Sequence, residues 1–156
     1  YALSGSCFCG RCWNNLLTTL DVSNNKVLRE LGCNYNQLTS LDISKDTALT
    51  ELGCNFNELT SLDVSGNHRL EYLNCWDNHL ETLDVSNNTS LKVLQCSGNQ
   101  LTSLDISNNT SLKGLLIEDM FSLNKVCVWV MPFPPDGVLV YTAGSPNVYF
   151  TTECNK

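Results

Sequence analysis

The sequence predicts a solenoid, in which the chain coils once per repeat and stacks its repeats along one axis. Leucines recur at a fixed 21-residue period, at Leu28, Leu49, Leu70, Leu91 and Leu112. Within each repeat, apolar residues two positions apart indicate a short strand with one buried face. A single repeat cannot bury such a face alone, so we expect neighbouring repeats to stack in register.

Each repeat contains one clear strand signal. Leu31 and Cys33 are two positions apart, so their side chains point to the same face of an extended chain. The same pattern recurs in the pairs Leu52/Cys54, Leu73/Cys75 and Leu94/Cys96. Stacked at about 4.8 Å, these strands form one continuous parallel sheet. The opposite wall is expected to carry the apolar residues that follow: Leu38, Leu41 and Ile43.

So short a repeat leaves little room for a helix between successive strands. We therefore predict turns and a second short strand around Thr39 to Ser44, and around the same positions of the other copies, on the convex side. The predicted fold class is a right-handed solenoid with a parallel sheet on its concave face and little helix.

The full copies share the consensus L-x-x-L-x-C-x-x-N-x-L-T-S-L-D-(V/I)-S-x-(N/D). This consensus resembles the leucine-rich repeat family, with Cys in place of the usual third Leu. The resemblance covers about Cys12 to Ile117, roughly two-thirds of the chain. The short unit and its phrase L-T-S-L-D-V-S-N-N-T look most like repeats of secreted or surface proteins of Bacteroidetes-type bacteria.

Composition divides the chain into three parts. Residues 1–11 are rich in Gly, Ser and Cys and lack the period, so we expect an N-terminal cap. Residues 12–125 form the repeats, of which the first is degenerate. Residues 126–156 are rich in β-formers, and we expect a C-terminal β-cap that lies over the open end and shields the last repeat. Its predicted strands are Val126–Val130, Val138–Tyr141 and Val148–Thr152, with a Pro-rich turn between the first two.

Two polar residues recur with the leucines. The first ladder is Asn36, Asn57, Asn78 and Asn99. In the resembled family this asparagine is buried and bonds to the backbone of neighbouring repeats, so we assign it a structural role. The second ladder is Asp21, Asp42, Asp63, Asp84 and Asp105. We expect each carboxylate to accept N–H groups of the Ser-x-Asn that follows. A row of Ca²⁺ ions is the alternative, but it needs about six oxygens per ion and the turns lack further acids.

The nine cysteines fall into two groups. Cys12, Cys33, Cys54, Cys75 and Cys96 follow the period and are expected to pack as small apolar residues. Among the others, we favour a disulfide between Cys127 and Cys154, which implies an oxidising compartment. Cys7-x-Cys9-x-x-Cys12 resembles half a zinc site, but the chain's two histidines lie several repeats away. We therefore expect a capping disulfide or buried thiols there, and no metal or cofactor.

Charge and motifs exclude several functions. A formal net charge of −7 argues against nucleic acid and against anionic membrane surfaces. No apolar run approaches the roughly 18 residues of a membrane-spanning helix. The sequence shows no signal peptide, which suggests a mature protein or an excised fragment. It also lacks a phosphate-binding glycine loop, H-E-x-x-H and G-x-S-x-G, so we do not expect an enzyme.

The remaining candidate site is the concave face, where outward positions vary while inward ones repeat. An aromatic stripe is predicted there, with amide and acidic side chains around it. The candidate ligand-binding residues are Trp13, Asn34, Tyr35, Asn55, Phe56, Tyr72, Asn74, Trp76, Asp77 and Gln95. Exposed Trp and Tyr are frequent binding anchors; the alternative is that the rings only shield the sheet. We predict non-catalytic recognition of a protein or glycan outside the cell. The competing hypothesis is a self-assembling adhesin or filament subunit at the cell surface.

Overall fold

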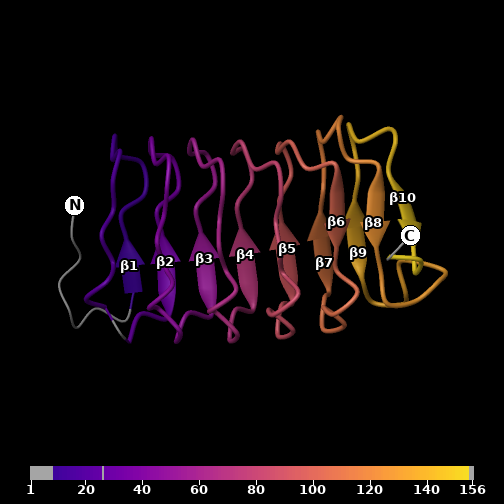
Figure 1. Ribbon diagram of the computed structural model, residues 1–156, viewed down its shortest axis with the longest axis horizontal. Helices are drawn as coiled ribbons and strands as arrows, with labels where there is room; N and C mark the ends of the chain where they lie inside the picture. Colours follow the sequence, from indigo (N-terminus) through magenta and orange to yellow (C-terminus); the bar gives the residue numbers. More distant parts are fainter. Residues whose placement is uncertain (1–8, 26, 155–156) are drawn as a thin grey trace.

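The computed structural model describes residues 9–25 and 27–154, and this part of the chain is a parallel β-solenoid of about seven repeats without helix (Figure 1). No segment within it is a helix long and apolar enough to cross a membrane. The main sheet has seven parallel strands in the order β1 (Cys9–Arg11), β2 (Glu30–Gly32), β3 (Glu51–Gly53), β4 (Tyr72–Asn74), β5 (Val93–Gln95), β7 (Gly114–Leu116) and β9 (Leu139–Tyr141). The predicted fold class is confirmed.

Register in the main sheet follows the leucine period. Leu31 pairs with Leu52, which pairs with Leu73, and the series continues through Leu94 and Leu115. These central residues of the strands point inward and are buried. The first and third residues of each strand therefore face outward, because side chains alternate along a strand.

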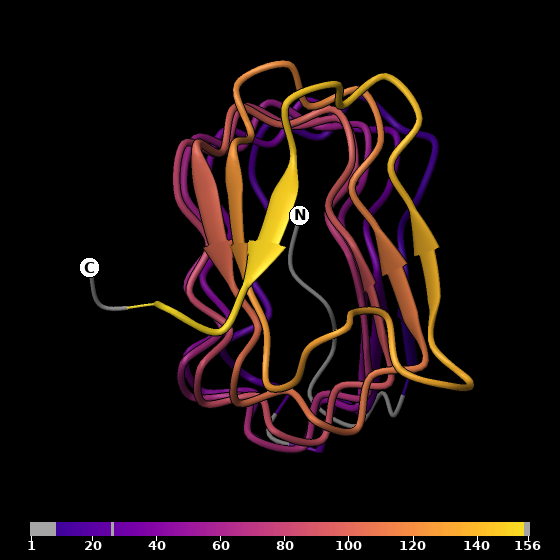
Figure 2. The same cartoon turned by 90° about the vertical axis from the view of Figure 1, so that its right-hand side faces the viewer.

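A second, three-stranded parallel sheet lies on the opposite wall (Figure 2), in the order β10 (Tyr149–Thr151), β8 (Lys125–Cys127) and β6 (Ser103–Asp105). The sequence predicts a second strand in every repeat. That is wrong for the earlier repeats that the structure describes, where residues 39–44 and their equivalents run as irregular chain and turns. The backbone bond from Glu58 N to Leu38 O, at 2.9 Å, joins two of these repeats where this segment begins, but no ladder follows it.

The C-terminal segment continues both sheets. β9 pairs in parallel with β7, and β8 pairs with β6 and β10 (Figure 2). This differs from the predicted placement over the open end, because Val126 and Val138 bury their side chains in the walls as the repeat leucines do. The boundaries predicted at residues 11/12 and 125/126 remain predictions, and most of the N-terminal segment, including Cys7, lies outside the described residues.

One core runs through all the repeats. It contains the leucines of both walls and the ladder of Cys12, Cys33, Cys54, Cys75 and Cys96, all of them buried free thiols. Burial raises the pKa of the Cys33 and Cys75 thiols to about 12, so these groups are neutral at physiological pH. They pack as small apolar side chains.

Buried asparagines join the repeats on the main-sheet side. The Nδ2 of Asn57 donates to the backbone oxygens of Cys33 and Cys54, both at 3.0 Å, while its Oδ1 accepts from Leu38 N at 3.0 Å. Asn36, Asn78 and Asn99 make the same set of bonds. Each amide therefore satisfies backbone groups of two repeats at the bend, where no sheet ladder reaches them.

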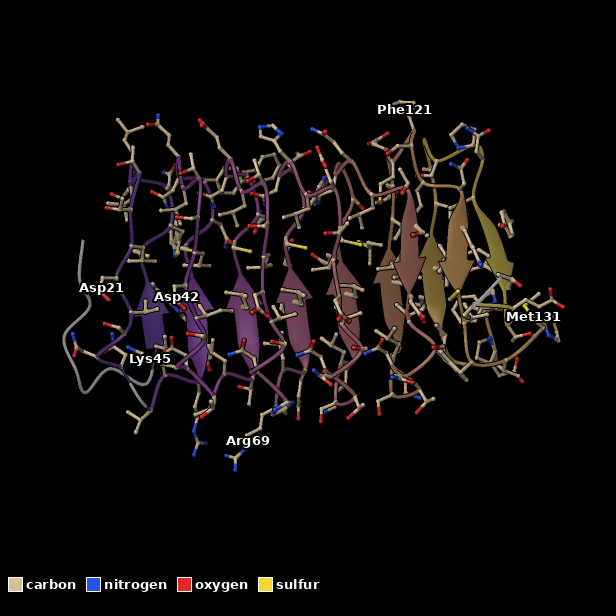
Figure 3. The ribbon with its side chains drawn as sticks, viewed as in Figure 1. Asp21, Asp42, Lys45, Arg69, Phe121 and Met131 are labelled. Atoms are coloured by element: carbon tan, nitrogen blue, oxygen red, sulfur yellow. The ribbon has the colours of Figure 1, made fainter. Side chains whose placement is uncertain are left out.

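The aspartates lie at corresponding places on successive repeats, as Asp21 and Asp42 do in Figure 3. The Oδ1 of Asp42 accepts from Ser44 Oγ at 2.7 Å and from Ser44 N at 3.0 Å. The other four aspartates accept from the corresponding serine N–H at 2.9 Å. These bonds lower the pKa of the Asp42 carboxyl. The predicted turn geometry is therefore present, and it occupies a carboxylate oxygen that a Ca²⁺ ion would need.

Candidate binding surface

The outer face of the main sheet is formed by the outward residues of its strands and by the two residues that follow each inward cysteine. Tyr72, Asn74 and Gln95 of the predicted set lie on the strands themselves. The others lie just beyond the strands: Trp13, Asn34, Tyr35, Asn55, Phe56, Trp76 and Asp77. All ten therefore lie along one side of the solenoid.

Three of the five predicted aromatic residues form a continuous row. The rings of Tyr35 and Phe56 stack with centroids 4.4 Å apart and an interplanar angle of 10°. The ring of Trp76 lies 5.7 Å from that of Phe56 and is tilted by 42°. Tyr35 is 51% exposed, and Phe56 and Trp76 are half-buried. The row is thus a surface feature that spans three repeats.

The two other aromatic residues line a hollow beside this row. Its volume is about 250 Å³, and Trp13 and Tyr72 lie on its walls. Trp13 is 56% exposed, whereas Tyr72 is half-buried and donates through its hydroxyl to Gln95 Oε1 at 3.1 Å. The remaining lining residues are Arg11, Glu30, Leu31, Gly32, Asn34, Glu51 and Gly53.

Glycine keeps the hollow open. A Cβ on Gly53 would lie 2.8 Å from Asn34 Oδ1, so the Asn34 amide packs directly over the Gly53 backbone. That oxygen also accepts from Asn55 N at 3.2 Å, which fixes the amide. Gly32 occupies the same place one repeat earlier. Sequence reasoning missed the hollow, although the repeated Glu-Leu-Gly of the two strands was a signal for it.

Two glutamates give the hollow a negative charge. Glu30 and Glu51 are cross-strand partners, so their carboxylates stand side by side. Arg11 lies 3.8 Å from the Glu30 carboxylate and offsets part of the charge. Two carboxylates with one arginine beside them leave the hollow with a net negative charge next to aromatic walls. This arrangement favours a ligand that offers a cationic group.

The backbone beneath the aromatic row is unusual. Tyr35 and Phe56 have φ angles of 54° and 53°, in the left-handed region that bulky residues avoid. The equivalent positions of other repeats are occupied by Asn14, Asp77 and Gly98, which are residue types that tolerate this region. The fold therefore requires a left-handed residue at this position but does not require an aromatic one.

Two candidate residues are placed differently from the prediction. Asn55 is only 6% exposed, so its side chain is not part of the surface. Asp77 is half-buried, and its Oδ1 fills the space where a Cβ on Gly98 would lie. Burial, helped by the charge of Asp119, raises the pKa of the Asp77 carboxyl.

Comparisons with known proteins support the fold. The functional domain of InlJ from Listeria monocytogenes, described as including a cysteine ladder, is 31% identical over 85% of this chain, with a TM-score of 0.77. The leucine-rich-repeat protein LIC12759 of Leptospira interrogans is 22% identical over 92% of the chain, with a TM-score of 0.73. The leucine-rich effector YopM of Yersinia pestis is 21% identical over 88% of the chain, with a TM-score of 0.58.

These structural neighbours are leucine-rich-repeat proteins, and this chain shares their solenoid architecture. It spans only 28%, 38% and 48% of their respective lengths. A family model for the LVIVD repeat matches residues 58–95 and 96–116, which together are less than half of the chain. No curated protein matches the sequence.

Proposed function

We propose that this chain is a non-catalytic recognition module that binds a protein partner through the outer face of its main sheet. Leucine-rich-repeat folds are protein-interaction modules, and the fold places a fixed scaffold behind a variable surface. The observation that carries the proposal is the row of Tyr35, Phe56 and Trp76. These rings are partly exposed, and two of them occupy a backbone conformation that Asn or Gly would adopt more easily.

Strained residues persist where function retains them. Aromatic side chains are the commonest anchors of protein interfaces because they offer a large rigid area at low entropic cost. The adjoining hollow adds the Glu30 and Glu51 carboxylates. A partner that inserts a Lys or Arg side chain there and packs an apolar segment on the rings would use both features. A neutral glycan would stack on the same rings but would offer no cationic group to these carboxylates.

The test is a binding profile of the purified chain on protein and glycan arrays, repeated with variants. Tyr35→Asn removes one ring while keeping a side chain that suits the local backbone. We expect affinity for the partner to fall at least tenfold. Phe121→Asn is the matched control, because Phe121 is 72% exposed at a rim of the solenoid (Figure 3). Unchanged binding by Tyr35→Asn and by Tyr72→Ala would place the site elsewhere.

An extracellular or cell-surface location is part of this proposal, as is kinship with surface proteins of Bacteroidetes-type bacteria. Both rest on the resemblance of the 21-residue repeats. Cell fractionation of the source organism, with detection of this protein in each fraction, tests this part separately from binding.

Self-assembly is the second candidate function. β9 and β10 are edge strands of the two sheets, and both lie at the C-terminal end (Figure 1). Leu139 and Tyr141 of β9 and Tyr149 of β10 are exposed. Edge strands with exposed apolar side chains are templates for pairing with another chain. Light scattering over a wide concentration range distinguishes the two functions, because a recognition module stays monomeric.

A further inference from the structure

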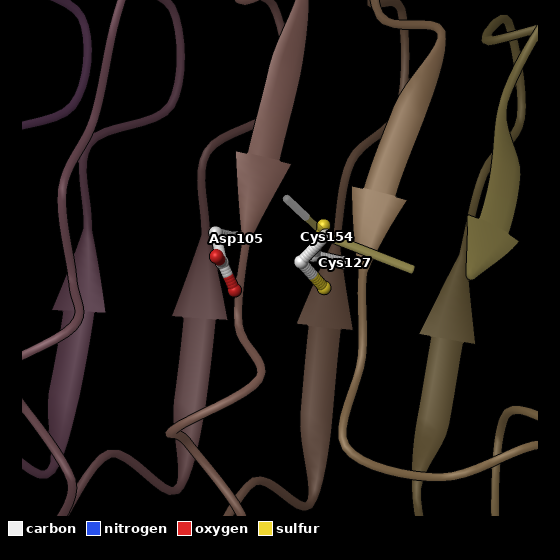
Figure 4. A group of neighbouring side chains, drawn as sticks. All are labelled: Asp105, Cys127 and Cys154. Atoms are coloured by element: carbon white, nitrogen blue, oxygen red, sulfur yellow. The ribbon is translucent and has the colours of Figure 1, made fainter. Parts of the chain in front are cut away.

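Three potential metal ligands converge on the wall opposite the proposed binding surface. Asp105 ends β6, Cys127 ends β8, and Cys154 follows β10 (Figure 4). A carboxylate oxygen of Asp105 and the Sγ atoms of both cysteines all lie within 4.8 Å of one another. The residues come from three parts of the chain that the second sheet brings side by side.

Strand register explains the cluster. Asp105 is the last member of the aspartate ladder, and its cross-strand partner on the next repeat is Cys127. Cys127 in turn pairs with Thr151, and the chain returns from there to Cys154. The ladder position that holds aspartate in earlier repeats thus holds a thiol here, and a second thiol is placed beside it.

The cluster is ordered by its surroundings. Asp105 Oδ1 accepts from Ser107 N at 2.9 Å, which fixes the orientation of the carboxylate. Cys154 Sγ makes a long contact of 3.9 Å to Thr151 O. Cys127 is 5% exposed, Cys154 is half-buried and Asp105 is exposed, so an ion can enter from solvent.

The electrostatics favour a cation. Lys125 is a positively charged neighbour of Cys127. Lys125 also donates to the Cys154 backbone oxygen at 3.3 Å. One carboxylate and two thiols, which are negatively charged when deprotonated, are packed together here, and a divalent ion would offset that charge.

We propose that Asp105, Cys127 and Cys154 form a binding site for one Zn²⁺-like divalent ion in the reduced protein. Two thiolates and one carboxylate match the ligand types of a zinc site, and a water molecule would complete four-coordination. On binding, each thiol releases its proton to solvent, so that two S–metal bonds replace two S–H bonds. The site with its ion then carries a net charge of −1, close to the positive Lys125.

The sequence prediction of a Cys127–Cys154 disulfide uses the same two sulfurs. Both cysteines are free thiols in the structure. A disulfide requires an S–S distance of about 2.0 Å, so it removes both metal ligands, and the two outcomes are mutually exclusive. Asp105 has no role in a disulfide, whereas it supplies the third ligand of the metal site.

The test uses Cd²⁺ as a spectroscopic probe on the full chain carrying Cys7→Ser and Cys9→Ser, so that these thiols do not contribute. The protein is reduced and then handled without oxygen. We expect one Cd²⁺ per chain with ultraviolet thiolate-to-metal charge-transfer absorption, displaced by Zn²⁺. Cys127→Ser and Cys154→Ser should each abolish that absorption, and Asp105→Asn should weaken binding at least tenfold. Asp84→Asn, at the same ladder position without thiols nearby, should bind as the parent does.

Thermal unfolding gives a second readout. Zn²⁺ should raise the melting temperature of the parent but not that of Cys154→Ser, whose half-buried side chain is the less disruptive one to change. Absence of the charge-transfer band, or its retention in Cys154→Ser, would overturn the proposal.

Discussion

The side chain of Asn78 donates a hydrogen bond to the backbone oxygen of Cys54, one repeat earlier, at 3.1 Å. Its Nδ2 also donates to Cys75 O at 3.1 Å, and its Oδ1 accepts from Leu59 N at 3.0 Å. Nδ2 also donates to Trp76 O at 3.3 Å, so one buried amide holds four backbone groups from two repeats. Repeat proteins derive their stability from such interfaces between neighbours.

Asn78→Ala should therefore be strongly destabilising. Three buried backbone groups would lose their partners, and each such loss costs about 1–3 kcal/mol. We expect the free energy of unfolding in urea to fall by at least about 3 kcal/mol. Asn87→Ala is the control, because Asn87 is exposed and its loss should change stability by less than about 0.5 kcal/mol. Similar losses for the two variants would contradict this account of the ladder.

A second asparagine ladder lies on the opposite wall, and Asp46 interrupts it. Asn67, Asn88 and Asn109 each donate through Nδ2 to two backbone oxygens. Asp46 occupies the equivalent position, is 1% exposed, and neither of its carboxylate oxygens has a partner. A carboxylate cannot donate the bonds that the amides make, so this is the weak point of the ladder.

Asp46→Asn should stabilise the protein by about 1–2 kcal/mol at pH 7, since the new amide can donate to the preceding repeat. Burial, together with the charge of Asp42, raises the pKa of Asp46 from 3.8 to about 6. The folded protein therefore favours the neutral Asp46 carboxyl. The stability that this preference adds is complete below pH 3.8 and is lost as pH rises through 6. Urea unfolding at pH 4 and pH 7 should show a larger gain for the variant at pH 7. An equal gain at both values would exclude this cause.

The sequence predicted the main sheet because Leu31 and Cys33 carry its period of two, and the 21-residue repeat carries its register. It predicted a second strand in every repeat, which is wrong for the earlier repeats that the structure describes. There a single backbone bond, such as Glu58 N to Leu38 O, joins neighbouring repeats and no ladder follows it. The Asp105–Cys127 pairing was also missed. These partners lie one position further apart than equivalent members of successive repeats, and irregular spacing cannot be aligned by periodicity. The hollow was missed because it is open only where Gly32 and Gly53 have no side chain.

The cysteine ladder should make the protein sensitive to alkali. Burial raises the pKa of Cys75 from 9.0 to about 12. The neutral thiol therefore adds stability that is complete below pH 9.0 and is lost as pH rises toward 12. Each pH unit in that window should remove about 1.4 kcal/mol per such thiol. Unfolding of reduced protein at pH 8, 9.5 and 10.5 measures this slope, and Cys75→Ala should be less steep by that amount. Parallel curves for the two proteins would refute it.

Tyr35→Asn should separate binding from stability. The change relieves an aromatic residue from a φ of 54° but loses its stacking on Phe56, and each effect amounts to about 1 kcal/mol. We therefore expect the free energy of unfolding to change by less than about 1 kcal/mol, although affinity for the partner falls. A loss well above that value would mean that the ring is a structural element of the solenoid, and the proposed role of the aromatic row would then lack its main support.

Gly98 packs against the carboxylate of Asp77, a residue of the candidate surface. Its φ is 63°, and a Cβ there would collide with the Asp77 carboxylate. Gly98→Ala should destabilise by about 1–2 kcal/mol, from backbone strain and from displacement of Asp77. In an Asp77→Ala background the strain and the 3.2 Å approach of the added Cβ to Trp76 Cδ1 remain, but the collision with Asp77 is removed. The cost should therefore fall, and a double-mutant cycle should give a nonzero coupling energy. Gly66→Ala is the control, because its added Cβ would lie 3.4 Å from Ser44 O and its φ is not positive. Strict additivity of the two changes would show that the Asp77 side chain yields without cost.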